Sequence, residues 1–93
     1  MEWTIDVNCR PVADGWTCRV TVTERGVSTS HDVSVSSAVL ARLAPGSSDP
    51  VDLVRRSFAF LLARERKESI LGRFELPLIC RYFTDYERTI RQG

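Results

Sequence analysis

The amino-acid sequence predicts an α+β fold, in which one face of a three-stranded antiparallel β-meander is covered by helices. Three consecutive segments alternate apolar and polar residues, which is the period of a half-buried strand. Short turn motifs separate these segments. Beyond them, apolar residues recur at helical spacing behind residues that typically cap helices. The strands are expected at about 3–10, 16–24 and 27–35, and the helices at about 37–43, 50–66 and 77–91.

The length and composition point to a single small globular domain that comprises residues 1–93. The chain is 43% hydrophobic and 27% charged, which are ordinary globular values and supply one core. No apolar run approaches the roughly 18–20 residues needed to span a bilayer. The first residues lack the basic and apolar stretches of a secretory signal. We therefore expect a cytoplasmic protein that does not associate with a membrane.

The first two strands are expected to form a hairpin around Asp14-Gly15, a common two-residue loop. The side chains expected on its inner face are Trp3, Ile5, Val7, Cys9, Trp16, Cys18, Val20 and Val22. This loop would give the opposed pairs Ala13–Trp16, Cys9–Val20 and Val7–Val22. Every apolar residue then falls on one face, whereas a slip of one residue would break that agreement.

A second tight turn is predicted at Arg25-Gly26, and it leads into the third strand. It places Val20 opposite His31 and gathers the apolar residues of segment 27–35 on the inner face. The outer face carries Thr, Ser, Asn, Arg and Asp, so it should meet water, a partner or another sheet.

Capping residues and prolines mark the beginnings of the helices. Ser36-Ser37 is expected to cap the short helix, and Asp49 is expected to cap the main helix ahead of Pro50. Residues 69–74 are expected to add one more helical turn, and Pro77 to open the final helix. The apolar positions of the two longer helices are Val51, Val54, Phe58, Leu61, Leu62, Ile79, Phe83, Tyr86 and Ile90.

Arginine supplies twelve of the thirteen basic side chains, against twelve acidic ones, so the net charge is only +1. Charge alone therefore does not imply binding to nucleic acid. The arginines of the main helix and its C-terminal end could still contact phosphate. These candidate nucleic-acid-binding residues are Arg55, Arg56, Arg64, Arg66 and Lys67. The alternative is that the basic groups simply complement the dipole at the end of the helix.

The three cysteines and the single histidine are the residues with metal-ligand chemistry. In the predicted register Cys9 and His31 lie in one row, Cys18 is a diagonal neighbour, and Cys80 on the final helix could approach them. Three Cys and one His can hold zinc, but the chain has no Cys-x-x-Cys pair. We expect buried thiols and an ordinary sheet histidine, with no cofactor. A disulfide between Cys9 and Cys18 is geometrically possible, but a reducing compartment disfavours it.

An aromatic cluster on the final helix is the strongest sign of an interaction surface. Tyr82, together with Leu78, would extend an apolar strip beyond the core. A last helix that is apolar on more than one side often covers a partner. The expected interface residues are Leu78, Tyr82 and Tyr86, and the partner would be a second copy of the chain or another protein.

Residues 57–65, 68–71 and 74–87 resemble a family of short bacterial proteins that carries no assigned function. The resemblance implies a stand-alone bacterial domain and supplies no catalytic residue. The order of a meander followed by a long helix is also similar to the architecture of HicB-type antitoxins. Those proteins carry Pro-Asp-Leu-Pro-Gly after the second strand, where this chain has Thr23-Glu24-Arg25-Gly26.

Three functions are compatible with these patterns. We favour a non-enzymatic module for protein interaction or regulation, because no catalytic constellation is evident and the final helix is aromatic. Ser30 and Asp32 flank His31 but point to the opposite face of the strand, so they do not form a triad with it. Nucleic-acid association through the arginines is the alternative. A small metal-binding or enzymatic domain is the third possibility.

Overall fold

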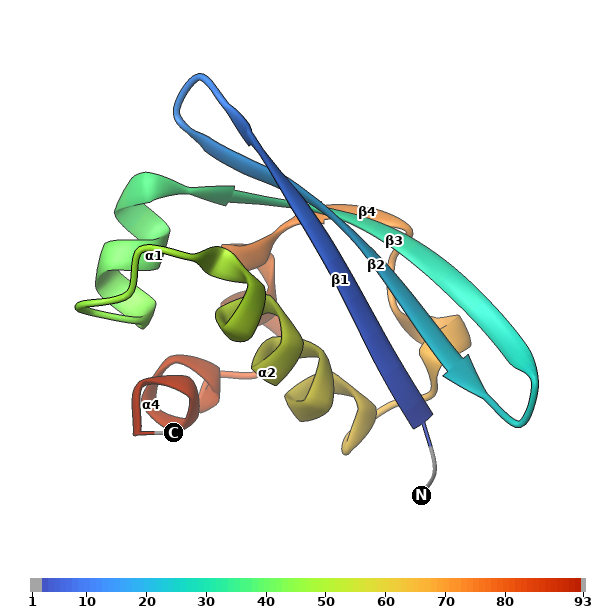
Figure 1. Ribbon diagram of the computed structural model, residues 1–93. Coiled ribbons are helices and arrows are strands. Elements are labelled where there is room, and N and C mark those ends of the chain that lie inside the picture. The colour runs from blue at the N-terminus through green and yellow to red at the C-terminus, as the bar shows by residue number, and fades with distance from the viewer. Residues whose placement is uncertain (1–2, 93) are drawn as a thin grey trace.

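The three alternating segments form long strands of one sheet in a computed structural model, which describes residues 3–92 (Figure 1). They are β1 (Trp3–Val12), β2 (Gly15–Glu24) and β3 (Val27–Ser36), joined as an antiparallel meander. The α+β class is thus confirmed. The sheet, however, has a fourth strand, β4 (Arg73–Glu75), and its order is β1-β2-β3-β4.

The register of the second hairpin is the expected one, and that of the first differs by two residues. In the second hairpin Val20 lies opposite His31. The turn residues Arg25 and Gly26 both adopt positive φ, as type I′ turns require. In the first hairpin Cys9 lies opposite Cys18, not opposite Val20. The turn residues there are Ala13 and Asp14, and an even shift leaves every side chain on its expected face.

Gly15 explains the shift, because its backbone is needed inside the strand. A Cβ atom at this position would lie only 2.1 Å from the carbonyl oxygen of Val35. The missing side chain lets β2 approach the end of β3 closely. The amide of Ser37 then donates to the carbonyl oxygen of Asp14 across 2.9 Å. The glycine therefore permits a close contact between β2 and β3. The turn lies one residue earlier in the chain than expected, at Ala13 and Asp14.

β4 forms where a further helical turn is expected in residues 69–74. Residues Lys67–Ser69 form a single 3-10 turn, η1, after which the chain runs along β3 in the parallel direction. The amide of Asp32 donates to the carbonyl oxygen of Gly72 across 2.8 Å, which begins the pairing. Phe74 is buried between exposed neighbours, and its ring centre lies 6.1 Å from that of Phe58 in the main helix. The edge of β3 thus gains backbone partners that a helical turn would not provide.

The helices begin where the caps predict, but the main helix ends early. α1 (Ser37–Leu43) is capped by Ser36, and the hydroxyl of this residue accepts a hydrogen bond from the amide of Val39. α2 (Pro50–Leu62) is capped by Asp49, whose carboxylate accepts from the amide of Val51 across 2.9 Å. The chain leaves the helix after Leu62, not at residue 66, and Lys67 is buried in the 3-10 turn that follows.

The continuous final helix expected at 77–91 is replaced by three short pieces. They are the 3-10 turn η2 (Leu76–Leu78), α3 (Ile79–Tyr82) and α4 (Tyr86–Gln92). Phe83 breaks the helix with an extended backbone, and its ring meets the ring of Phe60 edge to face at 5.8 Å. The break lets both short helices turn an apolar side chain inward, so Ile79 and Tyr86 are both buried.

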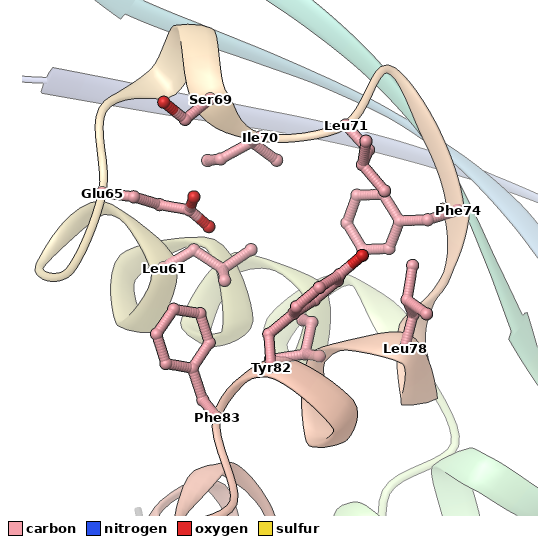
Figure 2. Close-up of a pocket in the computed structure, with 10 residues that line it drawn as sticks. Leu61, Glu65, Ser69, Ile70, Leu71, Phe74, Leu78, Tyr82 and Phe83 are labelled. Atoms are coloured by element: carbon pink, nitrogen blue, oxygen red, sulfur yellow. The ribbon is translucent and has the colours of Figure 1, made fainter.

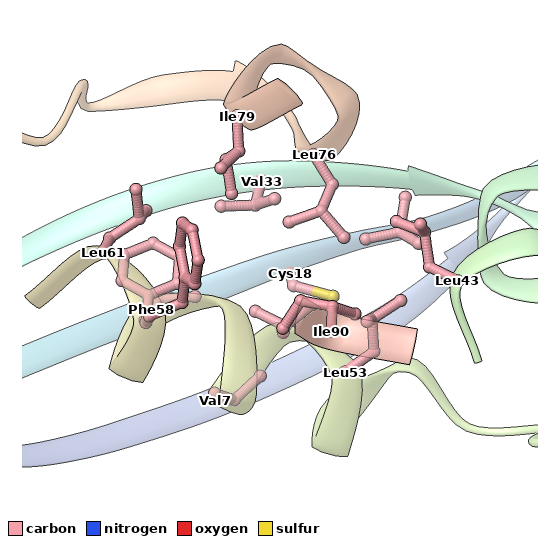
Figure 3. Packing of buried hydrophobic residues seen from close by; sticks show 14 of the residues in the cluster. Val7, Cys18, Val33, Leu43, Leu53, Phe58, Leu61, Leu76, Ile79 and Ile90 are labelled. Atoms are coloured by element: carbon pink, nitrogen blue, oxygen red, sulfur yellow. The ribbon is translucent and has the colours of Figure 1, made fainter. Parts of the chain in front are cut away.

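The core lies between the inner face of the sheet and the helices (Figure 3). Its centre consists of Val20, Val22 and Val33 from the sheet, together with Val54 and Phe58 from α2. The outer face of the sheet carries hydroxyls and charges, among them an ion pair between Arg19 and Asp32, and none of the helices formed by residues 3–92 covers it (Figure 1). No helix within residues 3–92 combines the length and the low charge that crossing a membrane would require.

Candidate functional site

An apolar pocket of about 410 Å³ opens to the surface between the end of α2, the segment that leads into β4, and α3 (Figure 2). Chain segments that are distant in sequence enclose it. Its ten lining residues are Leu61, Glu65, Ser69, Ile70, Leu71, Phe74, Leu78, Ile79, Tyr82 and Phe83.

The pocket has a buried floor and an exposed apolar rim. Leu61 and Ile79 of the floor belong to the core cluster. At the rim, Leu71 is 48% exposed and Tyr82 is 67% exposed. Only four large hydrophobic residues of the described chain are exposed to this degree, and two of them lie here. Exposed apolar side chains that gather around a concave surface are typical of a binding site.

Glu65 places the only charge on the pocket lining. Figure 2 shows its carboxylate directed over Leu61 into the pocket. Within residues 3–92 this carboxylate forms no hydrogen bond or ion pair, although the backbone amide of Glu65 donates to the carbonyl oxygen of Leu61. The neighbouring Arg64 turns away, stacks 3.6 Å from the ring centre of Phe60 and donates to Asp85. The carboxylate therefore has unused capacity to accept hydrogen bonds beside an apolar floor.

His31 fixes the rim of the pocket from beneath. The imidazole is 2% exposed, and its Nδ1 lies 2.8 Å from the carbonyl oxygen of Leu71. Since a carbonyl only accepts, Nδ1 carries a proton, and Nε2 lies 2.9 Å from the hydroxyl of Thr29. The ring also packs against Phe58, with 5.3 Å between ring centres. Nδ1 thus links the pocket segment to β3, while Nε2 contacts a side chain of β3 itself.

Lys67 secures the other side of the same segment. Its ammonium is buried and pairs with Glu68 at 2.9 Å and with Glu24 at 3.5 Å. The hydrogen bond to Glu68 is the main cause that raises the pKa of the lysine. The ion pair with Glu24 ties η1 to the end of β2. It thereby fixes the position from which Ser69 and Ile70 enter the pocket.

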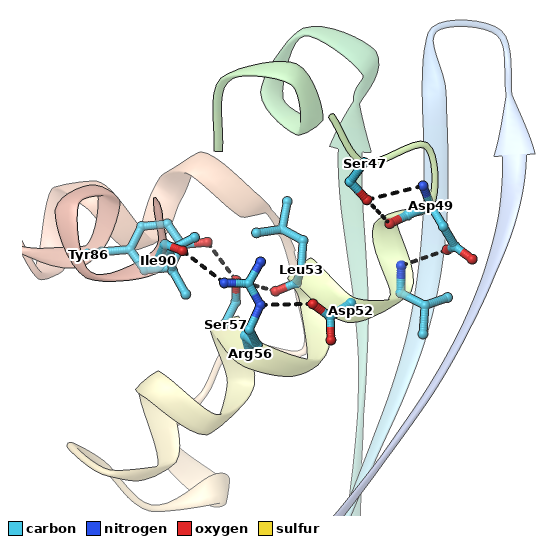
Figure 4. A network of polar contacts seen from close by, with 9 residues as sticks. Ser47, Asp49, Asp52, Leu53, Arg56, Ser57, Tyr86 and Ile90 are labelled. Carbon is cyan, nitrogen blue, oxygen red and sulfur yellow. Dashed lines mark hydrogen bonds and ion pairs between the residues drawn. The ribbon is translucent and has the colours of Figure 1, made fainter. Parts of the chain in front are cut away.

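The five basic residues proposed to bind nucleic acid do not form one exposed patch. Lys67 is buried in its ion pairs, and Arg64 is engaged with Phe60 and Asp85. Arg56 donates to the carbonyl oxygen of Ile90 at 2.8 Å and to Asp52 at 3.0 Å (Figure 4). The side chains of Arg55 and Arg66 are exposed.

The structure distributes the four candidate metal ligands among other roles. Cys9 and Cys18 form a disulfide, so the expectation of free thiols at these positions is wrong. The register explains the bond, because the two residues lie directly opposite each other. Cys80 is a half-buried free thiol on α3, and burial raises its pKa. With His31 engaged as described, residues 3–92 contain no group of His, Cys, Asp or Glu arranged to hold a metal ion.

Two of the three expected interface residues line the pocket, and the third lies in the core. Leu78 of η2 and Tyr82 of α3 both line its wall. Tyr86 is fully buried, because the break at Phe83 turns α4 inward. Its hydroxyl lies 2.6 Å from the hydroxyl of Ser57, and burial raises its pKa to about 12 (Figure 4). Tyr86 therefore stabilises the fold and does not lie at an exposed surface.

Sequence patterns gave no indication of Glu65 or Leu71. Glu65 follows a helix end in a run of charges, and such a residue is usually solvated. Leu71 lies in a segment expected to be helical. Comparison with known proteins adds no further candidate, because no family model, curated protein or solved structure matches the chain.

Proposed function

We propose that this protein is a non-enzymatic interaction module that binds a segment of another protein in the pocket between α2 and α3. An apolar side chain of the partner occupies the pocket, and an adjacent lysine or arginine of the partner pairs with Glu65. The observation that carries this proposal is the unpaired carboxylate above an apolar floor, next to the exposed side chains of Leu71 and Tyr82.

The size and the lining of the pocket favour one large side chain as the occupant. A volume of about 410 Å³ is at the small end of the range for ligand pockets. Besides Glu65, the polar groups on the lining are the hydroxyls of Ser69 and Tyr82. This set suits recognition, because one charge and two hydroxyls can orient an apolar group without a nucleophile and base acting on it.

The energetics predict weak and reversible binding at this pocket alone. Burying a leucine or phenylalanine side chain is worth about 1.5–3 kcal/mol. A partly exposed ion pair to Glu65 adds about 0–1 kcal/mol. Together these terms amount to about 1.5–4 kcal/mol, which corresponds to dissociation constants of about 1–100 mM, so a full partner must supply further contacts around the rim.

A titration with two small molecules of similar size and opposite charge tests the proposal. Phenethylammonium presents a ring beside a cation, and 3-phenylpropionate presents a ring beside an anion. In ¹H–¹⁵N NMR spectra at concentrations up to roughly 10 mM, we expect the ammonium compound to shift the amides of residues 69–74 and 78–83. The carboxylate compound should shift them far less, because Glu65 repels it.

Two variants identify the carboxylate that is responsible. Glu65→Gln should remove the preference for the cation and retain the weak binding of the ring. Glu75→Gln is the matched control, because Glu75 is an exposed carboxylate on β4 that does not line this pocket. Equal binding of the two compounds to the native protein, or shifts confined to another surface, would refute the proposal.

A further inference from the structure

The strand at one border of the sheet has free backbone groups along its outer side. Within the described part of the chain, β1 pairs only with β2. The pair Val12–Gly15 closes this register around a two-residue turn. In such a hairpin the closing pair is hydrogen-bonded, and bonded and non-bonded pairs alternate from there. The residues whose N–H and C=O groups point away from β2 are Trp3, Ile5, Val7 and Cys9, with the carbonyl of Pro11 in addition.

Apolar side chains along this border are only half-buried. Trp3 and Ile5 point to the inner face and contact the core, but they remain partly exposed. α2 packs beneath β1 (Figure 1). Val51 and Leu62 of this helix are also only partly buried, and their spacing places them on one side of it. A second sheet with its own helix beneath it, set edge to edge against this border, would cover these side chains.

The outward-facing side chains of β1 are complementary to themselves. Asp6, Asn8 and Arg10 are exposed and follow one another on the outer face. If a second β1 lies antiparallel with the two Asn8 residues opposite each other, Asp6 of each copy faces Arg10 of the other. A shift by two residues in either direction removes both ion pairs. The hydrogen-bonded pairs in this register are Val7 with Cys9 and Ile5 with Pro11, all of which have free groups on the outer side.

We propose that two copies of the chain associate through β1, with a two-fold axis at Asn8, to form one continuous eight-stranded sheet. Pairing at a sheet border supplies backbone hydrogen bonds, and the charge pattern fixes the register. The pocket described above lies next to β4, at the opposite border of the sheet. Both pockets therefore stay open in the dimer, and this proposal does not depend on the function proposed for them.

Charge reversal at the border tests the partner and the register together. Sedimentation velocity over about 1 µM to 1 mM should show a reversible dimer of the native chain. Each single variant, Asp6→Arg or Arg10→Asp, creates two pairs of like charges across the two-fold axis. Each should therefore weaken the dimer on the order of tenfold. The double variant Asp6→Arg/Arg10→Asp should restore the native affinity. Ser30→Arg is the matched control on the exposed face of β3, away from the border, and should leave the dimer unchanged.

A cross-link provides a second measurement that depends on the register. In a Cys80→Ser background, Asn8→Cys places two thiols in a close, non-bonded pair, so oxidation should link the copies. Thr4→Cys should not form a link, because the two residues would be about 27 Å apart along the strands. A chain that stays monomeric at 1 mM, a double variant that is not restored, or a link at Thr4 in place of Asn8 would each overturn the proposal. Circular dichroism of every variant verifies that it is folded.

Discussion

Ser57→Ala is expected to destabilise the native chain and to have almost no effect once Tyr86 has been replaced by Phe. The hydroxyl of Ser57 lies 2.8 Å from the carbonyl oxygen of Leu53 and 2.6 Å from the hydroxyl of Tyr86, and both side chains are fully buried. Because a carbonyl only accepts, the proton of Ser57 goes to Leu53, and Tyr86 is the donor to Ser57.

The magnitudes follow from which group is left without a partner. Ser57→Ala leaves the buried phenolic O–H of Tyr86 unpaired, which costs about 1–3 kcal/mol. The better helix propensity of alanine offsets about 0.5 kcal/mol of this cost. Tyr86→Phe removes the donor itself and costs about 1 kcal/mol, the net value of an ordinary hydrogen bond. In the Phe background no donor remains to be stranded, so the serine substitution should be close to neutral.

Urea unfolding of the four proteins measures this coupling. Trp3 and Trp16 provide the fluorescence signal, and the slope of the unfolding free energy with urea should be the same in all four. We expect a coupling free energy of about 1–3 kcal/mol between the two positions. If Ser57→Ala lowers the stability equally in both backgrounds, the two hydroxyls do not share a hydrogen bond and the assignment of donor and acceptor is wrong.

Three further predictions concern pH, packing and the disulfide. The pKa of Tyr86 is raised to about 12, so between about pH 10 and pH 12 the unfolded chain loses the phenolic proton while the native state keeps it. Stability should therefore fall by about 2–3 kcal/mol as the pH rises through this range, and urea midpoints of Tyr86→Phe should lack this part of the decline. Gly15→Ala should cost about 1–3 kcal/mol in urea unfolding, because its Cβ would collide with a carbonyl oxygen of β3, whereas Gly72→Ala, where the space is open, should be nearly neutral. Reduction of the Cys9–Cys18 bond should lower the free energy of unfolding by about 2–3 kcal/mol. The Cys9→Ala variant lacks this bond, so an equal loss of stability in that variant on adding the reductant would contradict this account.

The strands and their faces could be predicted from the sequence because alternation is a local property. The register of the first hairpin could not, because a shift by two residues leaves the alternation unchanged. The close approach of Gly15 to β3 distinguishes the two registers, and that contact involves a third strand. A Cys9–Cys18 disulfide was recognised as possible from the sequence, but only the register of the structure places the two residues directly opposite each other.

The pocket was only partly predictable for a similar reason. Leu78 and Tyr82 were expected at a surface because they fall outside the apolar stripe of the final helix. The inward turn of Tyr86 depends on the break at Phe83, which forms because the aromatic ring packs against a residue of α2. β4 is too short to show a period, and it forms only against an edge that the distant β3 provides.

The connection between β3 and β4 has a consequence for the order in which the molecule opens. β1, β2 and β3 are joined by tight turns, whereas β4 reaches β3 only after both α1 and α2 have been placed between them. Its three residues pair along one side, so this border should detach at a lower free energy than the meander. Amide hydrogen exchange should then be faster at Arg73–Glu75 than in β2, and the wall of the pocket that includes Phe74 could swing outward to admit a bulky group while the rest of the chain stays folded.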